Sequence, residues 1–201
     1  MPLPSEVAYW EGVARKLVTD EGALRKDNVH KRPHQLRRLL EYCWIDQRVL
    51  EIGTGNSMVA GALKVIIQGH WKYIGTELSA SFRKAAKEMF FLETVEADVR
   101  EIPGEGYTRI IALDSLEHVR PEHRLEGYAK IASVAAPDAL LFIHLSRSES
   151  FHDPEFDHPF GLRDLAMLED VGFVLNSYDR YKCDLPDRSM DYAFVVMQKC
   201  A

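Results

Sequence analysis

The stretch VLEIGTGNS, residues 49–57, runs from a short apolar segment into two glycines that flank a threonine. Gly53 and Gly55 permit a tight turn in which backbone N–H groups approach a ligand, because no Cβ stands in the way. In a parallel sheet, ligands bind at the carboxyl ends of the strands, where the first strand-to-helix turn lies. A glycine turn alone is a weak signal, so its meaning depends on the surrounding residues.

Apolar segments alternate with amphipathic ones along the rest of the chain. After two N-terminal helices, one with Ser5 as its N-cap and one opening after Pro33, five strands are expected, at 48–52, 72–78, 93–98, 109–114 and 139–145. Helices are expected between them at 58–68, 79–91 with Ser79 as N-cap, and 121–136. A last helix at 162–172 precedes two strands, 173–181 and 192–199, which should pair antiparallel across a loop at 183–191.

This order predicts an α/β fold. We expect a doubly wound, seven-stranded, mostly parallel sheet of Rossmann-like type, with an antiparallel C-terminal strand pair. No repeat, low-complexity tract or linker interrupts the pattern. The sequence therefore predicts one domain over residues 1–201, with residues 1–45 as an N-terminal helical cap.

Composition narrows the classes of partner. The net charge is −6 and the pI is near 5.8, so no global positive field would attract nucleic acid or an anionic membrane. The basic stretch HKRPHQLRR at 30–38 is the exception, and we expect it to be a solvated helix start. No apolar run approaches the roughly 18 residues that span a bilayer, and the N-terminus lacks the features of a signal peptide.

The three cysteines, Cys43, Cys183 and Cys200, lie far apart and have no CxxC spacing. This pattern suits reduced thiols in the cytoplasm better than disulfides or a zinc site. We therefore expect a cytoplasmic protein that binds neither nucleic acid nor membranes. The sequence does not indicate which oligomeric state the protein adopts.

Acidic residues accompany the glycine turn. A dinucleotide fingerprint would require a third glycine at position 58, where the chain has Met58. Glu51 would repel a phosphate and favour a cation. Glu77, Asp98 and Asp114 end the next three strands, and Glu77 stands where a carboxylate commonly binds a ribose diol. Each acid could instead cap a helix, but together they predict an acidic crevice suited to a cationic nucleoside.

The segments VLEIGTGNS, IGTELS, EADV, ALDSLEHV, PDALLFI and LAMLEDVGF resemble, in order and spacing, those of class I S-adenosylmethionine-dependent methyltransferases. The resemblance is to the small enzymes of ubiquinone and menaquinone biosynthesis, and it covers about three quarters of the chain, from Val49 to Lys199. It implies the methyltransferase version of the Rossmann-like fold, with S-adenosylmethionine as cofactor. One departure is Ser57, where many members have a third glycine.

The resemblance also implies roles for individual residues. The methionine part of the cofactor would be bordered by Glu51, Gly53 and Gly55, together with Thr54 and Asn56 of the same turn. Glu77 would accept hydrogen bonds from both ribose hydroxyls, with Leu78 against the adenine face. Asp98 would accept from the adenine amino group, and Val99 would pack on the ring. Asp114 and Ser115 would line the side that bears the methyl group.

Methyl transfer requires a nucleophile held about 3–3.5 Å from the methyl carbon in a dry site. A general base is needed only where the nucleophile carries a proton. His118, four residues after Asp114, is the best candidate for that base, because imidazole titrates near neutral pH. The alternative is that His118 only caps a helix or shapes the pocket wall.

Two other segments are candidates for pocket walls. The loop SFHDPEFDHPFG at 150–161 carries possible metal ligands in His152, Asp153, Glu155, Asp157 and His158, but their spacing matches no standard zinc site, so we expect no metal. We expect that loop to form one wall of an acceptor pocket. In the N-terminal segment, Tyr9 and Trp10 are expected to pack or to cover the cofactor, and Lys31 or Arg32 to reach its carboxylate.

The sequence therefore predicts a methyltransferase that acts on a small-molecule acceptor, with oxygen slightly favoured as the methylated atom. Two alternatives stay open. One is a nucleic-acid or protein methyltransferase, for which residues 30–38 would be the binding segment. The other is a noncatalytic protein that binds S-adenosylmethionine.

Overall fold

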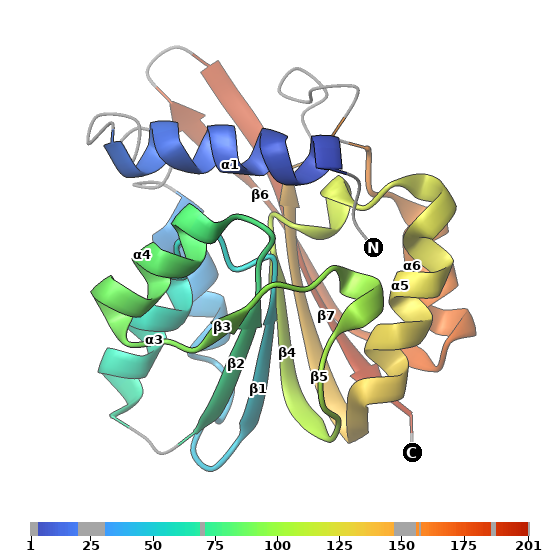
Figure 1. The fold of residues 1–201 in the computed structure, drawn as a ribbon. Helices are drawn as coiled ribbons and strands as arrows, with labels where there is room; N and C mark the ends of the chain where they lie inside the picture. The colour runs from blue at the N-terminus through green and yellow to red at the C-terminus, as the bar shows by residue number, and fades with distance from the viewer. Residues whose placement is uncertain are drawn as a thin grey trace.

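The computed structural model describes residues 4–19, 31–68, 71–146, 156, 158–185 and 188–200. They form a seven-stranded sheet with helices on both faces (Figure 1). The strands are β1 (Arg48–Ile52), β2 (Lys72–Thr76), β3 (Thr94–Val95), β4 (Tyr107–Leu113), β5 (Ala135–Ser146), β6 (Phe173–Leu185) and β7 (Arg188–Lys199). The helices are α1 (Pro4–Thr19), an unlabelled helix at 31–39, α3 (Met58–Ile67), α4 (Ala80–Phe90), α5 (Pro121–Val134) and α6 (Leu162–Asp170).

The strand order is β3-β2-β1-β4-β5-β7-β6. Strands β1 to β5 pair in parallel, whereas β7 runs antiparallel to both β5 and β6. The predicted fold class is therefore confirmed, including the antiparallel C-terminal pair. Because the chain moves outward from β1 to β3 and then returns to β4 on the other side, a crevice opens between the carboxyl ends of β1 and β4.

Two apolar clusters hold the helices to the sheet. On one face, α5 and α6 pack on strand residues such as Ile110 and Leu141. On the other face, the helix at 31–39 and α3 pack on Val49, Ile111 and Phe142. Buried parallel strands carry apolar side chains on both faces, which is why RVLEI and RIIALD are nearly continuous apolar runs. Hydrophobic burial is the main stabilising contribution of both layers.

Helix α1 lies across the carboxyl ends of the strands, over the crevice (Figure 1). Glu11 accepts hydrogen bonds from the Ser79 hydroxyl at 2.8 Å and from the Ser81 backbone N–H at 3.2 Å, at the start of α4. In the first turn of α1, Glu6 accepts from Nε of Arg120 at 2.7 Å. These bonds attach α1 to both sides of the crevice, whereas the helix at 31–39 packs on a face of the sheet.

The structure corrects several boundaries. The second helix already includes residues 31–33, so it does not open after Pro33, and β5 begins at Ala135, where the end of a helix was expected. The expected strand at 93–98 is reduced to Thr94–Val95, so Asp98 lies beyond the strand as the N-cap of a 3₁₀ turn. The expected loop at 183–191 is mostly strand, because β6 and β7 continue their ladder through the pair Leu185 and Arg188. Helix α1 begins at Pro4, so Ser5 lies inside it and is not its N-cap. Ser79 caps α4 as predicted, accepting from Phe82 N–H.

Within the described ranges, no helix combines the length and the apolar character that crossing a membrane requires.

Candidate functional site

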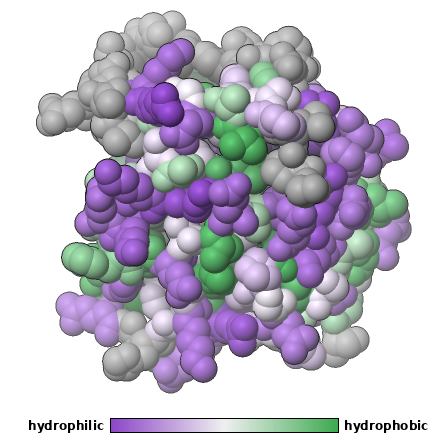
Figure 2. All heavy atoms as spheres, viewed as in Figure 1, coloured by the Kyte–Doolittle hydropathy of each residue, from purple (hydrophilic) through white to green (hydrophobic). Residues whose placement is uncertain are grey.

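The crevice below α1 contains a cavity of about 330 Å³. Figure 2 shows hydrophilic side chains over most of this face and hydrophobic ones at its centre, below α1. All twelve residues that the sequence assigned to the cofactor or to catalysis line this one cavity: Glu51, Gly53, Thr54, Gly55, Asn56, Glu77, Leu78, Asp98, Val99, Asp114, Ser115 and His118. The structure therefore brings them together.

The turn after β1 needs its glycines for two different reasons. Gly53 has a φ of +63°, and a Cβ there would lie 2.7 Å from Cβ of Ser115. Gly55 has a φ of +50°, and a Cβ there would meet no atom within 4 Å, so the backbone faces open space that a ligand can fill. Ser57, which stands where the family often has a third glycine, also adopts a left-handed conformation, with a φ of +54°.

The Glu77 carboxylate lies beside this turn and is held by backbone groups. Its Oε2 accepts from Gly55 N–H at 2.8 Å and its Oε1 from Ser79 N–H at 2.9 Å. Burial raises the pKa of Glu77, while these two N–H groups oppose that shift. The result is a fixed carboxylate at the end of β2, oriented before any ligand arrives.

Glu51, in β1, is buried. The Tyr73 hydroxyl, on the neighbouring strand β2, donates to Glu51 at 2.5 Å. Burial raises the pKa of Glu51 to about 7, and the Tyr73 hydrogen bond and the charge of Arg32 only partly offset this effect. Near neutral pH this carboxyl is therefore partly protonated, and a cation in the cavity would favour its ionised form.

Asp98 and Val99 lie at the end of the cavity nearest α5 and the η1 turn (Val99–Glu101). Oδ1 of Asp98 accepts from the backbone N–H of Arg100 at 2.9 Å and from its Nε at 2.7 Å. Among the described residues, no group donates to Oδ2 of Asp98. That oxygen can accept a hydrogen bond from a ligand, beside the apolar surface of Val99.

Asp114 directly follows β4 and has a φ of +52°, which is uncommon for a residue with a side chain. Oδ2 of Asp114 lies 2.8 Å from the Lys31 ammonium. Ser115, the next residue, is buried, and among the described residues its hydroxyl has no hydrogen-bond partner. A buried polar atom in a cavity wall favours a polar ligand group at this position.

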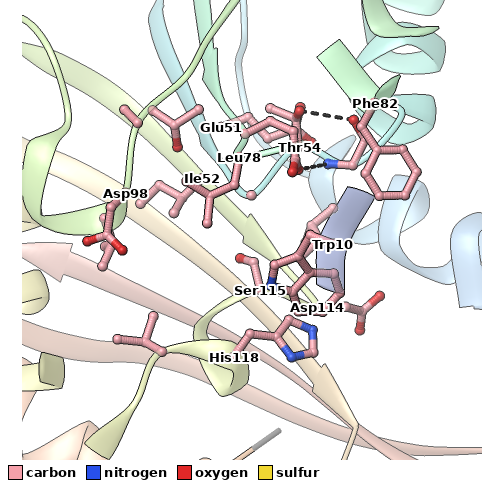
Figure 3. Close-up of a pocket in the computed structure, with 18 of the residues that line it drawn as sticks. Trp10, Glu51, Ile52, Thr54, Leu78, Phe82, Asp98, Asp114, Ser115 and His118 are labelled. Carbon is pink, nitrogen blue, oxygen red and sulfur yellow. Dashed lines mark hydrogen bonds between the residues drawn. The ribbon is translucent and has the colours of Figure 1, made fainter. Parts of the chain in front are cut away.

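His118 lies in the η2 turn (Leu116–His118), and its ring contacts Trp10 of α1, with 4.5 Å between ring centroids. Figure 3 shows Trp10, Asp114, Ser115 and His118 gathered at one side of the cavity, with Asp98 at the other. Trp10 therefore covers the side where His118 is exposed to a ligand, which is the covering position weighed for it from the sequence.

The crevice is less acidic than the sequence predicted. Five carboxylates line it, Glu6, Glu51, Glu77, Asp98 and Asp114, but so do four cations, Lys31, Arg32, Arg100 and Arg120. Three of these acids are already paired with cations, namely Glu6, Asp98 and Asp114. A row of bare negative charges is therefore wrong as a description, and the cavity suits a ligand that carries charges of both signs.

Sequence reasoning missed several residues around Asp114. Buried His144 on β5, buried Gln35 of the helix at 31–39 and half-buried Tyr181 on β6 form a polar group behind the cavity wall. The histidine inside the apolar strand ALLFIHL was a signal that could have identified this group. In the sheet, His144 pairs with Leu113 of β4, and Leu113 immediately precedes Asp114. Arg100, Arg120 and His123 also line the cavity and were not assigned a role from the sequence.

The expected acceptor wall at 150–161 is described only in part. His152, Asp153, Glu155 and Asp157 lie outside the described residues. Phe156 stacks on Tyr9 of α1 with 3.9 Å between centroids, and His158 N–H donates to the Glu117 carbonyl. A buried ion pair between Arg124 and Asp164 fixes the adjoining backbone, because Arg124 also donates to the carbonyls of His158 and Pro159.

In the part of the chain that the structure describes, no three acidic, histidine or cysteine side chains are grouped closely enough to hold a metal ion.

No protein-family model and no curated protein matches this sequence. Solved structures do match the fold. One is the N-methyltransferase NodS of Bradyrhizobium japonicum in complex with S-adenosylhomocysteine, with a TM-score of 0.75, 12% identity, and coverage of 94% of this chain and 98% of that chain. Another is a putative methyltransferase in complex with a methyltransferase activator of Haloferax volcanii, with a TM-score of 0.76, 13% identity, and coverage of 100% and 98%. The [4+2]-cyclase SpnF also matches, with a TM-score of 0.68, 14% identity, and coverage of 84% and 80%. The chain therefore has the fold of the class I methyltransferases.

Proposed function

We propose that the protein is an S-adenosylmethionine-dependent methyltransferase that acts on a small molecule. The observation that carries this proposal is the Glu77 carboxylate, fixed by Gly55 N–H and Ser79 N–H beside an open glycine turn. This arrangement offers a ribose diol two oriented carboxylate oxygens next to backbone that a ligand can approach closely. The mixed charges of the cavity fit a zwitterion that also carries a sulfonium.

The proposed cofactor would lie along the cavity with its adenosine toward α5. Leu78 and Val99 would pack on the adenine, and Oδ2 of Asp98 would accept from its amino group. The methionine part would lie against Gly53, Thr54, Gly55 and Asn56, where Glu51 is matched to its ammonium. Lys31 and Arg32, which line the same end, would bind its carboxylate.

The cofactor supplies an electrophilic methyl group on a positively charged sulfur. The chain itself has three tasks, which are to exclude water, to hold the acceptor in line, and to take its proton. Trp10 and Val13 of α1 cover the cavity and perform the first task. Asp114 and Ser115 line the side where the acceptor must arrive, and the Ser115 hydroxyl can orient it.

We assign proton removal to His118. It lines the cavity beside Ser115, and the Trp10 contact fixes its ring. A base at this position is needed for a hydroxyl, which must lose its proton, more than for an amine with a free lone pair. This is why we favour oxygen slightly as the methylated atom.

The fold does not decide the reaction, since a cyclase shares it. A protein that binds the cofactor without transferring its methyl group is therefore the second candidate.

The test is transfer of a labelled methyl group from S-adenosylmethionine to a panel of phenols, carboxylic acids and amines. We expect His118→Gln to lower turnover about 100-fold on the best acceptor, because general base catalysis contributes 10²–10⁴-fold. The affinity of the same variant for the cofactor should stay within about threefold of wild type. Unchanged turnover would remove the base role. Tight cofactor binding without transfer to any acceptor would favour the second candidate.

A further inference from the structure

A chain of hydrogen bonds leads from the cavity wall across the sheet to β6. Oδ1 of Asp114 lies 2.6 Å from Nδ1 of His144, and Nε2 of this imidazole lies 2.6 Å from the Tyr181 hydroxyl. His144 is completely buried, and of these three residues only Asp114 lines the cavity. The sheet topology makes the chain possible, because Tyr181 reaches His144 over Tyr192 of β7, on whose ring both residues stack.

Electrostatics fix the direction of these hydrogen bonds. Burial disfavours the charged form of Asp114, but the charge of Lys31, the hydrogen bond from His144 and the charge of Arg32 outweigh it and hold the Asp114 pKa well below its usual range. A carboxylate can only accept, so Nδ1 of His144 carries the proton and Nε2 accepts from the Tyr181 hydroxyl. The Gln35 amide nitrogen lies 2.7 Å from the same Nδ1, and with this proton in place it donates to Oδ2 of Asp114 and not to His144. Burial lowers the pKa of His144 and favours the neutral imidazole, while the charge and the hydrogen bond of Asp114 oppose this shift.

The second oxygen of Asp114 faces the helix at 31–39. Oδ2 lies 2.8 Å from the Lys31 ammonium, 3.2 Å from the Gln35 amide nitrogen and 3.8 Å from the Arg32 guanidinium. Asp114 therefore stands between His144 and the two cations that line the cavity. Its left-handed backbone conformation persists only where surrounding contacts hold it, and His144 supplies such contacts through both its side chain and its carbonyl.

We propose that His144 is a positioning residue of the cofactor site. It holds the Asp114 carboxylate so that Lys31 and Arg32 present their charges to the carboxylate of the methionine part, and Tyr181 fixes the imidazole from the opposite side. The inference rests on the proposed function and adds to it a residue that never touches the cofactor.

A purely structural role for this buried group makes a different prediction. The series of contacts continues beyond Tyr181. Its ring stacks on the His34 ring with 3.6 Å between centroids, and Nε2 of His34 lies 3.3 Å from Oδ2 of Asp179. If the group served stability alone, its loss would weaken all ligands of the cavity alike. The positioning role confines the loss to ligands that carry the amino-acid part.

The experiment compares two ligands by isothermal titration calorimetry. S-adenosylhomocysteine carries the amino-acid part, whereas 5′-methylthioadenosine lacks it. The variants are His144→Leu, which removes both hydrogen bonds, and His144→Asn, whose amide nitrogen can replace Nδ1 as donor to Asp114. The control is Tyr128→Phe, which removes another buried hydroxyl, the one bonded to Asp164 on the opposite face of the sheet.

We expect His144→Leu to weaken S-adenosylhomocysteine binding about 10- to 100-fold, as for loss of a hydrogen bond to a charged group, and 5′-methylthioadenosine binding less than about twofold. His144→Asn should recover most of the difference, and Tyr128→Phe should change neither affinity. Equal loss for both ligands, or no loss for either, would overturn the inference.

Two further results keep the test decisive. If His144→Leu does not fold, Tyr181→Phe takes its place, with an expected loss of about threefold confined to S-adenosylhomocysteine, and the absence of that selective loss overturns the inference. If the wild-type protein binds neither ligand, the proposed function fails and this inference fails with it.

Discussion

Glu51, in the motif VLEIGTGNS, is buried, and its burial changes the pKa of its carboxyl. Its pKa of about 7 arises from burial, opposed by the Tyr73 hydroxyl and by Arg32. In the unfolded chain the same carboxyl has a pKa near 4.5. Between these two values the folded protein binds more protons than the unfolded one, so the contribution of Glu51 to stability falls as the pH rises from 4.5 to 7.

A cationic cofactor should lower the raised pKa of Glu51, because a nearby positive charge favours the ionised carboxyl. At pH 6 we expect cofactor binding to release up to about one proton, and at pH 8 almost none. Calorimetry in two buffers of different ionisation enthalpy measures this number. Glu51→Gln should abolish most of the release.

The matched control for Glu51→Gln is Glu117→Gln. Burial also raises the pKa of Glu117 to about 7, but this side chain does not line the cavity. The control should leave most of the proton release in place. Equal release in wild type and Glu51→Gln would show that Glu51 is not the titrating group.

Gly53 is a second residue whose identity the geometry dictates. Gly53→Ala would place a Cβ 2.7 Å from Cβ of Ser115 in a left-handed conformation, so we expect a loss of stability of about 2 kcal/mol. Gly12→Ala is the control, since a Cβ there meets nothing within 4 Å and the site lies inside α1. That change should stabilise by up to about 1 kcal/mol. Urea denaturation compares both variants, and equal stability would contradict this account of the turn.

At the scale of elements, α1 closes the cavity through contacts of Glu6 in its first turn and of Glu11 near its middle. Hydrogen bonds from Ser81 and Ser79 lower the Glu11 pKa to about 2, so the bond to the start of α4 persists throughout the neutral range. The sign follows from a depressed pKa. The stabilisation by Glu11 is complete above about pH 4.5 and is lost as the pH falls toward 2.

We expect Glu11→Gln to loosen α1 without unfolding the sheet. Amide hydrogen exchange in residues 4–19 should become about tenfold faster, which corresponds to 1.4 kcal/mol of local stability, while exchange in β4 and β5 stays unchanged. Lys16→Gln, an exposed change in the same helix, should have no effect. If exchange rises across the whole sheet, α1 is part of the global folding unit rather than a separable cover.

The elements differ in how well the sequence predicts them. Continuous apolar runs such as RIIALD identified the central strands, because a strand buried on both faces carries apolar side chains at nearly every position. The strand at 93–98 was overextended, since its charged residues lie at an edge that only β2 pairs. A loop was expected at 183–191, but the ladder between β6 and β7 continues through the pair Leu185 and Arg188, a case where strand pairing outweighs local propensity.

At the scale of the whole molecule, the strand order explains why the predicted site residues meet. Glu51, Glu77 and Asp114 lie within one residue of the ends of adjacent strands, so knowing the strands was enough to group them. The partners of those residues were not predictable in this way. Asp114 contacts Lys31 and His144, which lie 83 residues before it and 30 after it, and no local pattern encodes such contacts.

The central claim is that this cavity binds S-adenosylmethionine rather than a dinucleotide. Met58 replaces the glycine that a pyrophosphate site needs, and the carboxylates of Glu51 and Glu77 disfavour phosphates. Calorimetric titration of the wild-type protein with S-adenosylhomocysteine, and separately with NAD, tests this claim most directly. The account predicts one-site binding of S-adenosylhomocysteine and no heat with NAD, whereas silence with S-adenosylhomocysteine or saturable binding of NAD alone would contradict it.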